Sequence, residues 1–300
     1  MNTHAQRHRK PATASLVSPH APHQRAANPF PQHSATITQY QHPLIQRIHR
    51  LRRREARDQT GLYYAEGLRF VIQAIQHHAA IEALVICRPL LTNALAQRLV
   101  RQQRQLGVPV LDVTPHVMHQ LAFVEDPQGI GAVVRQHWEA LAGLTLRSEL
   151  CWIALQTVRS VGNLGTILRT SDAVGGAGVI LLGNDIDPYD PAAVRPTMGA
   201  LYSQRLVRTT VAEFVRWKHQ QRCMLVGTSP GAPTDYRALA YRPPTILLMG
   251  EERKGLTPEL QALCDHLVRI PMVGESDSLN LGVATGVMLY ELFNQHRSPY

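Results

Sequence analysis

The chain has 300 residues, of which 44% are hydrophobic, and its formal net charge is +9. This length suggests two ordinary domains, and no apolar run approaches the roughly 18 residues needed to span a bilayer, which excludes a membrane-spanning protein. The whole charge excess lies in residues 1–54, which hold nine Lys or Arg and no acidic residue, because residues 55–300 hold 22 basic and 22 acidic residues. The basic composition therefore describes a tail and is no evidence that the folded body binds nucleic acid.

Residues 1–43 are predicted to form a disordered basic tail. This segment contains six prolines and little apolar periodicity, so it cannot bury enough surface to offset the entropy lost on ordering. No apolar stretch of a secretory signal follows its charges, and its prolines disfavour the amphipathic helix of an organellar transit peptide. Two interpretations stay open: a solvated tail, or a segment that weakly attracts RNA phosphates.

The cysteines favour a reducing compartment. Cys87, Cys151, Cys223 and Cys264 are far apart, and none forms a C-x-x-C pair. Most of them lie in or beside apolar strand-like runs, where a buried reduced thiol is expected, so we predict a cytoplasmic protein. No His/Cys cluster has the spacing of metal ligands, and no metal site is predicted.

Residues 44–136 are predicted to form a first, small α/β domain, because strand-like runs and helical segments alternate there. It opens with a helical segment over 44–57, in which apolar residues form one stripe and six arginines cover the other faces. Those arginines could form a solvated surface or follow RNA phosphates, and the sequence does not decide between these readings. Thr114, which precedes a proline, is expected to cap a short helix. The strands are expected near 62–66, 81–87, 108–113 and 130–136.

A linker over 137–150 leads to a second domain, residues 151–297. Apolar strand-like runs recur there between helical segments, which predicts a mostly parallel sheet covered on both faces. The strands are expected near 151–156, 178–183, 204–209, 224–229, 245–250 and 266–272, and a helix is expected near 191–200. The dinucleotide fingerprint, the P-loop and the nucleophile elbow are all absent, which excludes the commonest nucleotide-binding and hydrolase folds.

Two small-residue loops stand out near the end of the chain. Gly250–Gly255 and Gly274–Asn280 each follow a strand-like run, and the second leads directly into a helical segment. Loops of this kind expose backbone groups that can hold a polar ligand close to a helix N-terminus. Ser278 and Asn280 could also be simple helix caps, and the residues alone leave both readings open.

A further polar cluster accompanies the first helix of this domain. Asn163 is expected to be its N-cap, and Arg169, six residues later, points roughly to a different side of the helix. Arg169 has apolar neighbours such as Leu168 and Val174, so it is expected to be partly buried. A semi-buried arginine can be a structural ion pair or a functional group.

Taken in order, three segments resemble the motifs of the SpoU/TrmH family. They are NLGTILR at 163–169, GEERKGL at 250–256 and RIPMVGESDSLN at 269–280. Upstream, YAEGLRFVIQAI and DPQGIGAVVRQ resemble the start and end of the RNA-binding domain that precedes the catalytic domain in many members. Each motif alone is weakly specific, but the three in this order form a strong signal. The layout is more similar to the ribosomal-RNA enzymes, including the thiostrepton-resistance type, than to the tRNA type.

The resemblance implies a metal-independent, homodimeric RNA ribose 2′-O-methyltransferase that uses S-adenosylmethionine, with ribosomal RNA as the expected substrate. It implies a trefoil-knotted α/β domain preceded by a small α/β, L30e-like RNA-binding domain. The residues that match cofactor-binding positions are Gly250, Ile270, Leu279, Met272 and Thr228. The residues that match catalytic polar positions are Arg169, Asn163, Glu252, Ser278 and Asn280.

Two of these matches carry a physical expectation. Glycine at 250 is expected because main chain without a Cβ can lie against the adenosine of the cofactor. Arg169 is the residue implied to lie nearest the ribose 2′-hydroxyl. Because an arginine stays protonated, we expect it to fix the adjacent phosphate and stabilise the developing alkoxide, and not to act as a free base.

Two departures from the family pattern leave target choice and dimer contacts less defined. Leu281-Gly282 stands where Val-Ser is usual, and Pro196 interrupts a segment in which a small residue more often follows the arginine. Neither removes a matched catalytic residue, so activity is expected. The alternatives are a tRNA 2′-O-methyltransferase of the same family and a non-catalytic RNA-binding or ribosome-assembly protein on the same scaffold. The non-catalytic reading predicts loss of the polar motif residues, and all five are present.

Overall fold

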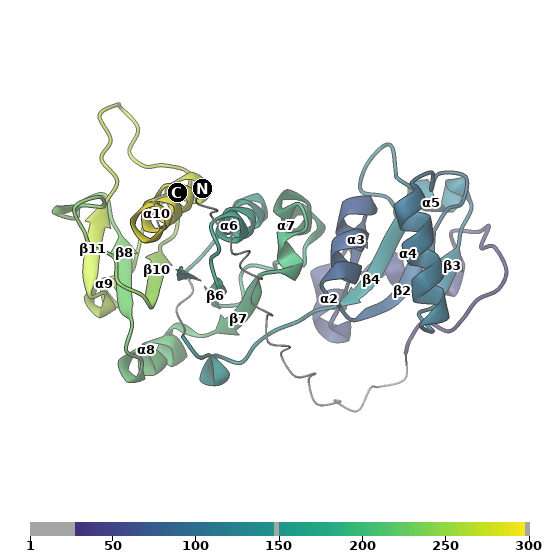
Figure 1. Cartoon of the computed structure of the whole chain (residues 1–300), viewed down its shortest axis with the longest axis horizontal. Coiled ribbons are helices and arrows are strands. Elements are labelled where there is room, and N and C mark those ends of the chain that lie inside the picture. The colour runs from purple at the N-terminus through teal and green to yellow at the C-terminus, as the bar shows by residue number, and fades with distance from the viewer. Residues whose placement is uncertain (1–27, 147–149, 298–300) are drawn as a thin grey trace, which may run out of the picture.

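A computed structural model describes residues 28–146 and 150–297, which form two α/β units side by side (Figure 1). The first unit is built on a four-stranded sheet of order β1-β4-β2-β3. Its strands are Leu62–Glu66 (β1), Ile81–Ile86 (β2), Val110–Asp112 (β3) and Ile130–Arg135 (β4). Its helices are Pro43–Arg50 (α1), Arg54–Thr60 (α2), Leu68–Gln76 (α3), Ala94–Gln105 (α4) and Pro115–Leu121 (α5). Thr114 caps α5, as predicted, since its hydroxyl accepts a hydrogen bond from the Val117 N–H at 3.5 Å.

The segment 28–42 is packed onto this unit, so the expectation of disorder up to residue 43 is wrong for this part. Phe30 is fully buried and Ile37 is 3% exposed, both in the apolar cluster behind the small sheet. The Ile37 N–H donates to the Asp112 carbonyl at 2.8 Å, and the Thr114 N–H donates to the Ile37 carbonyl at 3.1 Å. Two buried side chains and hydrogen bonds at the sheet edge thus offset the ordering entropy. The predicted disorder of residues 1–27 lies outside the described residues.

The arginines of 44–57 mostly contact protein. Arg57 is 1% exposed and pairs with two carboxylates of the second unit, Asp187 at 2.7 Å and Asp190 at 2.9 Å. Arg54 donates to two backbone carbonyls of the second unit that come just before Asp187 in the chain. Arg52 donates to the carbonyls at the end of α5, at 2.7 to 3.3 Å. These arginines therefore hold the fold together, and they are neither a simple solvated face nor free to follow phosphates.

The second unit is built on a seven-stranded sheet of order β7-β6-β5-β10-β8-β11-β9, in which every pair is parallel. Its strands are Trp152–Leu155 (β5), Gly178–Leu182 (β6), Arg205–Thr209 (β7), Met224–Thr228 (β8), Thr234–Asp235 (β9), Thr245–Met249 (β10) and His266–Arg269 (β11). Its α-helices are Val161–Ala173 (α6), Pro191–Val194 (α7), Val211–Gln220 (α8), Pro258–Leu263 (α9) and Leu281–His296 (α10). Three 3-10 turns are Leu141–Gly143 (η1), Arg195–Thr197 (η2) and Ala200–Tyr202 (η3). The trefoil knot that the resemblance implies stays a prediction.

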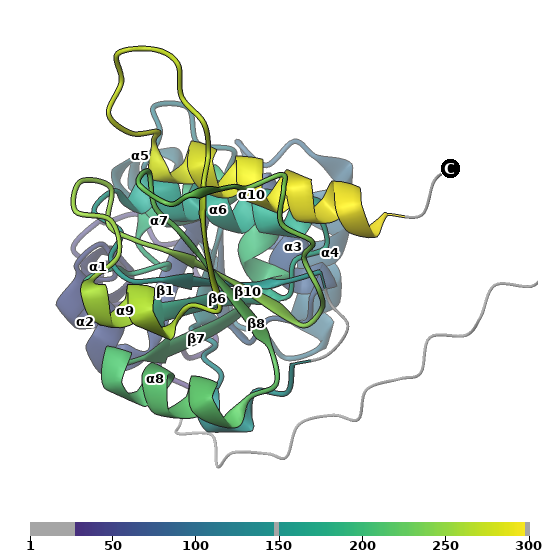
Figure 2. The same cartoon turned by 90° about the vertical axis from the view of Figure 1, so that its left-hand side faces the viewer.

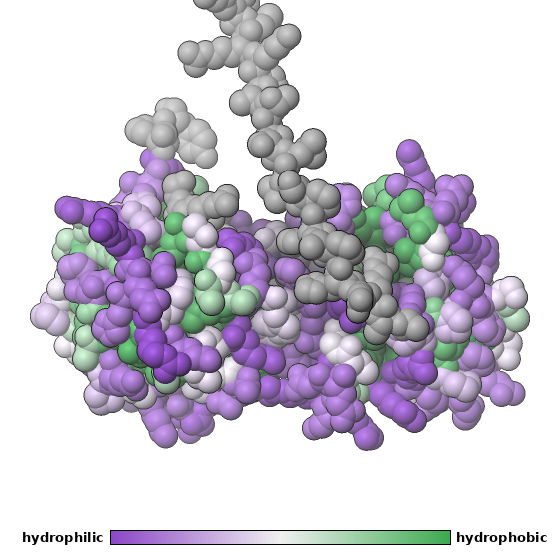
Figure 3. Space-filling model, turned by 90° about the horizontal axis from the view of Figure 1, so that it is seen from below, coloured by the Kyte–Doolittle hydropathy of each residue, from purple (hydrophilic) through white to green (hydrophobic). Residues whose placement is uncertain are grey.

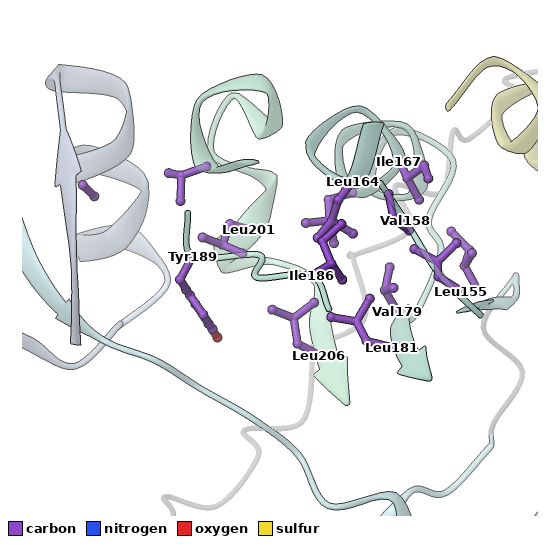
Figure 4. Packing of buried hydrophobic residues seen from close by; sticks show 14 of the residues in the cluster. Leu155, Val158, Leu164, Ile167, Val179, Leu181, Ile186, Tyr189, Leu201 and Leu206 are labelled. Atoms are coloured by element: carbon purple, nitrogen blue, oxygen red, sulfur yellow. The ribbon is translucent and has the colours of Figure 1, made fainter. Parts of the chain in front are cut away.

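Helices cover both faces of this sheet, as predicted (Figure 2). On one face, Leu164 and Ile167 of α6 point toward Val179 and Leu181 of β6 (Figure 4). On the other face, Phe214 of α8 packs in a second cluster with the opposite side of the strands. No helix in the described ranges is long and apolar enough to cross a bilayer.

The two sequence departures lie at close contacts of α6. A Cβ built on Gly282 of α10 would lie 3.2 Å from Oδ1 of Asn280 and 3.4 Å from Thr166 of α6, which is near ordinary van der Waals contact, so this position of α10 faces α6. A Cβ built on Gly165 of α6 would lie 2.9 Å from Pro196. The helix expected near 191–200 is broken here, because Met198 adopts a left-handed conformation (φ 52°). Both departures therefore belong to the packing around the first motif.

Replacing Arg57 should destabilise the protein strongly. Arg57→Ala leaves Asp187, which is 4% exposed, as a buried carboxylate without its cation, and such truncations cost about 3–5 kcal/mol. For a chain of this size this corresponds to a fall of about 10 °C in Tm, measured by calorimetry or circular dichroism. Arg53→Ala is the control, because Arg53 is an exposed arginine next to the same helix. Equal melting temperatures for the two variants would contradict a structural role for the buried pair.

Candidate functional site

A cavity of about 350 Å³ lies at the carboxyl ends of β8 and β10, beside the N-terminus of α10. Ligands of parallel α/β sheets characteristically bind outside the carboxyl ends of the strands. All five residues predicted to bind the cofactor line this cavity: Thr228, Gly250, Ile270, Met272 and Leu279. Two of the predicted catalytic residues, Glu252 and Ser278, also line it. The structure thus brings together residues from three separate segments, although their individual roles stay predictions.

Gly250 is required by the loop that it starts. The loop is closed by two backbone hydrogen bonds between Glu251 and Gly255, at 3.1 and 2.9 Å. A Cβ built on Gly250 would lie 2.3 Å from the carbonyl carbon of Gly255 and 2.4 Å from the Leu256 nitrogen. Sequence reasoning attributed this glycine to contact with adenosine. The structure gives a reason that holds even without a ligand, which is close contact of the loop with itself.

A chain of hydrogen bonds joins the three motifs. The side-chain amide of Asn163 donates to Glu252 Oε1 at 3.1 Å, and its oxygen accepts from the Asn280 amide at 3.0 Å. The Asn280 oxygen in turn accepts the N–H of Gly282 at 2.9 Å and that of Val283 at 3.3 Å. Asn280 is therefore the N-cap of α10, as one of the two readings proposed, and it also fixes the orientation of Asn163.

The prediction that Asn163 caps α6 is wrong. Ser160 precedes the first helical residue, and Asn163 lies within the first turn. Its side chain forms hydrogen bonds with residues that are distant in the chain, and rules for helix caps consider only neighbouring residues. Sequence reasoning also missed Arg159, whose N–H donates to Glu252 at 3.4 Å and whose guanidinium pairs with Glu251. The signal that could have identified Arg159 is its position in the loop that follows β5 at the same edge of the sheet.

Arg169 is exposed, which corrects the expectation of partial burial. Its neighbours Ile167 and Leu168 turn toward the sheet, so Arg169 falls on the outer side of α6. It does not line the cavity at β8 and β10. Among the described residues, its side chain has no hydrogen-bond or ion-pair partner. Arg169 is thus a free cation on α6, and the structural ion-pair reading is excluded for the described part of the chain.

The fold and the cavity define the class of protein. A parallel sheet covered on both faces, with a cavity at its carboxyl edge lined by apolar and polar residues, is the architecture of an α/β enzyme with a small organic ligand. Within residues 28–146 and 150–297, no group of three or more His, Cys, Asp or Glu side chains could hold a metal ion.

Comparison with known proteins identifies the family. Residues 150–290 match the SpoU rRNA Methylase family, and residues 42–132 match an MRM3-like substrate binding domain. The 23S rRNA (uridine(2479)-2′-O)-methyltransferase of Streptomyces viridochromogenes is 31% identical over 252 residues, which cover 82% of this chain and 87% of that protein. The chain belongs to the SpoU rRNA methylase family, as its motifs predict.

Solved structures agree in fold over both units. An AdoMet-bound rRNA methyltransferase from Sinorhizobium meliloti superposes with a TM-score of 0.81 at 34% identity, covering 88% of this chain and 99% of that one. The SpoU methyltransferase AviRb from Streptomyces viridochromogenes, in complex with AdoMet, gives 0.76 at 29% identity, covering 85% and 98%. The predicted arrangement, a methyltransferase domain preceded by a substrate-binding α/β domain, is confirmed.

Gly250→Ala should weaken binding of S-adenosylmethionine by tenfold or more. The added Cβ cannot fit without moving the backbone of Gly255 and Leu256, and both residues line the cavity. The affinity is measured by isothermal calorimetry, with about tenfold equal to 1.4 kcal/mol. Gly274→Ala is the control, because a Cβ there meets no atom within 4 Å. Equal affinity of Gly250→Ala and the unmodified protein would show that this loop does not shape the cofactor site.

Proposed function

We propose that this protein transfers the methyl group of S-adenosylmethionine to a ribose 2′-hydroxyl of ribosomal RNA. The observation that carries the proposal is the cavity at β8 and β10, whose wall contains every residue matched to a cofactor position. The hydrogen-bonded chain from Asn163 to Glu252 and Asn280 lies directly beside it. The family and the rRNA methyltransferases among the relatives support ribosomal RNA as the substrate class.

The cavity fits a ligand that has both apolar and polar parts. Ile270, Met272 and Leu279 give it an apolar wall, and the main chain of the Gly250 loop and the side chain of Glu252 give it a polar one. When bound, S-adenosylmethionine supplies an electrophilic methyl carbon. The protein must then hold the ribose oxygen in line with that carbon, at about 3 Å. The reactants lose their translational and rotational entropy on binding, so the transfer step itself loses little more.

We assign Arg169 the task of holding the phosphate next to the reacting ribose. An arginine stays charged, so it stabilises the developing alkoxide by its field and its hydrogen bonds and does not remove the proton itself. Its exposure and its lack of a partner in the described chain leave the guanidinium free for this role. Arg169 does not line the cofactor cavity of its own chain, which favours a role in the site of a second copy.

We propose a homodimer that resolves this separation. α6 and α10 lie side by side on one face of the sheet (Figures 1 and 2). On α10, Val283 is 54% exposed and Tyr290 is 49% exposed, and their spacing of seven residues places them on one side of the helix. Exposed apolar side chains gathered in this way mark association surfaces. The face of the molecule on the α8 side shows hydrophilic residues with hydrophobic patches between them (Figure 3). In such a dimer, Arg169 of one protomer completes the site of its partner.

We also propose the cytoplasm as the compartment, where ribosomal RNA and reducing conditions occur together. All four cysteines are free thiols. Cys87 and Cys151 are buried, and burial raises the pKa of the Cys151 thiol to about 12, so it stays protonated and unreactive at neutral pH.

Arg169→Ala should lower the rate of methyl transfer about 10²–10³-fold, which corresponds to about 2.7–4 kcal/mol, as for the loss of one preorganised donor. Single-turnover transfer of a labelled methyl group to a ribosomal RNA transcript measures the rate, and calorimetry should show unchanged S-adenosylmethionine affinity. Arg216→Ala, on the exposed side of α8, is the control. A loss below about tenfold would show that Arg169 has no role in methyl transfer. Methylation of a transcript that is 2′-deoxy at the target nucleotide would exclude the ribose 2′-hydroxyl as the acceptor.

Co-expression of Arg169→Ala and Gly250→Ala subunits should give a mixed dimer that is more active than either parent, when S-adenosylmethionine is limiting so that Gly250→Ala sites stay mostly empty. If Arg169 acts in the partner's site, each mixed dimer has one site with both defects and one with neither, so it should show about half of the normal rate. Differently tagged subunits allow the mixed dimer to be purified and assayed, with light scattering as the check of its mass. A purified mixed dimer that is less active than Gly250→Ala alone would show that Arg169 serves the site of its own chain.

A further inference from the structure

A second cavity, of about 460 Å³, lies between the two units. The first unit lines it with Tyr64 and Glu66 of β1, Phe70 of α3 and Phe123 of the loop after α5. The second unit contributes the segment of α7 and η2 that includes Arg195. It shares no lining residue with the cavity at β8 and β10, so the cofactor site leaves it unexplained.

Two polar atoms of this wall have no hydrogen-bond partner in the described chain. One is the hydroxyl of Tyr64, a residue that is 4% exposed, and the other is Oε1 of Glu66. The second carboxyl oxygen of Glu66 accepts the N–H of Phe123 at 2.5 Å. Burial raises the pKa of the Glu66 carboxyl, and the Phe123 N–H, Arg52 and Arg195 oppose that shift. Buried polar atoms without partners are costly and rare, which indicates that something else pairs with them.

The remaining groups of the wall define the chemistry of that partner. Phe70 and Phe123 are half-buried rings of the wall, and the Arg52 guanidinium lies over the Phe123 ring at 4.8 Å from its centroid, so Phe70 is the ring with no such cover. Arg69 and Arg195 are exposed cations at the rim. A planar ring that presents N–H donors and is joined to phosphate matches all of these features, and proteins recognise unpaired RNA bases by stacking together with hydrogen bonds to the base edges. Glu125 and Asp126 also line the cavity and are exposed carboxylates, which disfavour a phosphate directly beside them.

We propose that this cavity binds one unpaired base of the substrate RNA, with Glu66 accepting a hydrogen bond from an N–H of the base and Tyr64 supplying its hydroxyl. The proposal rests on the proposed function, because it assumes an RNA substrate. Both polar atoms lie beneath the surface of the cavity, so the base reaches them by displacing a side chain of the wall. Since both units form the wall, the bound base fixes the RNA relative to the cofactor site.

Glu66→Gln provides the test, because both oxygens of the carboxylate act as acceptors. In the variant, the glutamine oxygen can still accept the Phe123 N–H, but its NH₂ group then points toward the cavity. There it meets an N–H of the base, and two donors cannot form a hydrogen bond. Binding of fluorescently labelled single-stranded oligonucleotides of about eight A, C or U residues should weaken about tenfold for the preferred base. Loss of a negative charge by itself strengthens RNA binding, so a weakening cannot come from charge alone.

Glu55→Gln is the charge-matched control, since Glu55 is an exposed carboxylate on α2 outside the cavity. It should bind RNA as well as the unmodified protein does, or better. An oligonucleotide whose preferred base lacks the N–H, such as purine riboside for adenosine or N3-methyluridine for uridine, should lose as much affinity as Glu66→Gln causes. The two losses should not add, because they remove the same hydrogen bond.

Tyr64→Phe supplies a second variant that does not depend on how Glu66→Gln folds. Removing an unpartnered buried hydroxyl should leave Tm unchanged or raised, while RNA affinity should fall several-fold. A structural role alone would lower Tm and leave RNA affinity unchanged. RNA binding by Glu66→Gln equal to or tighter than that of the unmodified protein overturns the proposal. Binding of spermidine, a polycation, to Glu66→Gln is measured in parallel. If this variant loses spermidine affinity and keeps its RNA affinity, the cavity binds a cation and the proposal is overturned.

Failure of this inference is distinguishable from failure of the proposed function. Normal methyl transfer to ribosomal RNA by Glu66→Gln, with unchanged RNA affinity, removes the base site and leaves the methyltransferase assignment intact. Base-dependent binding that needs Glu66, in a protein that transfers no methyl group to any ribosomal RNA transcript, removes the assignment and leaves the base site.

Discussion

The functional surfaces of this protein depend on how its two sheets are held against each other, and a buried arginine provides that hold. Arg57 pairs with Asp187 and Asp190 across the boundary between the units. A charge that stays buried without its partner is strongly unfavourable, so this pair specifies how the two units pack. Arg69 adds a bond to the Met198 carbonyl at 2.6 Å. These contacts set the position of the cavity between the units relative to the cavity at β8 and β10, and the proposed transfer to RNA would depend on that relation.

Within the second unit, Asn163 has the corresponding role at the scale of one site. It joins Glu252, 89 residues away, to Asn280, 117 residues away. An amide suits this position because it donates on one side and accepts on the other. The loop after β10, the start of α10 and the first turn of α6 are thus tied to one another. The polar groups beside the cavity are thus held on secondary-structure elements, as preorganised sites need.

The sequence was informative where a local pattern decides the outcome. Parallel strands follow from buried apolar runs, and the caps Thr114 and Asn280 follow from residue type and position. It failed where distant contacts decide. Asn163 does not cap its helix because far partners use its amide, and Arg169 is exposed because its apolar neighbours in sequence occupy another side of the helix. The segment around Phe30 is held by a few buried side chains, and the average composition of residues 1–43 does not reveal such single contacts.

The charge balance explains why recognition must depend on a few placed groups. Residues 55–300 carry as many acidic as basic side chains, so the body lacks the broad positive field that supports non-specific RNA binding. Several arginines of the first unit are also engaged in holding the fold, as Arg52 and Arg57 show. Few groups stay available for RNA: the exposed guanidinium of Arg169, and the cavity in which the Tyr64 hydroxyl and one carboxyl oxygen of Glu66 have no hydrogen-bond partner in the described chain. The proposed RNA contacts would therefore draw their affinity from shape and base contacts, which favours one site in a structured RNA over phosphate backbone in general.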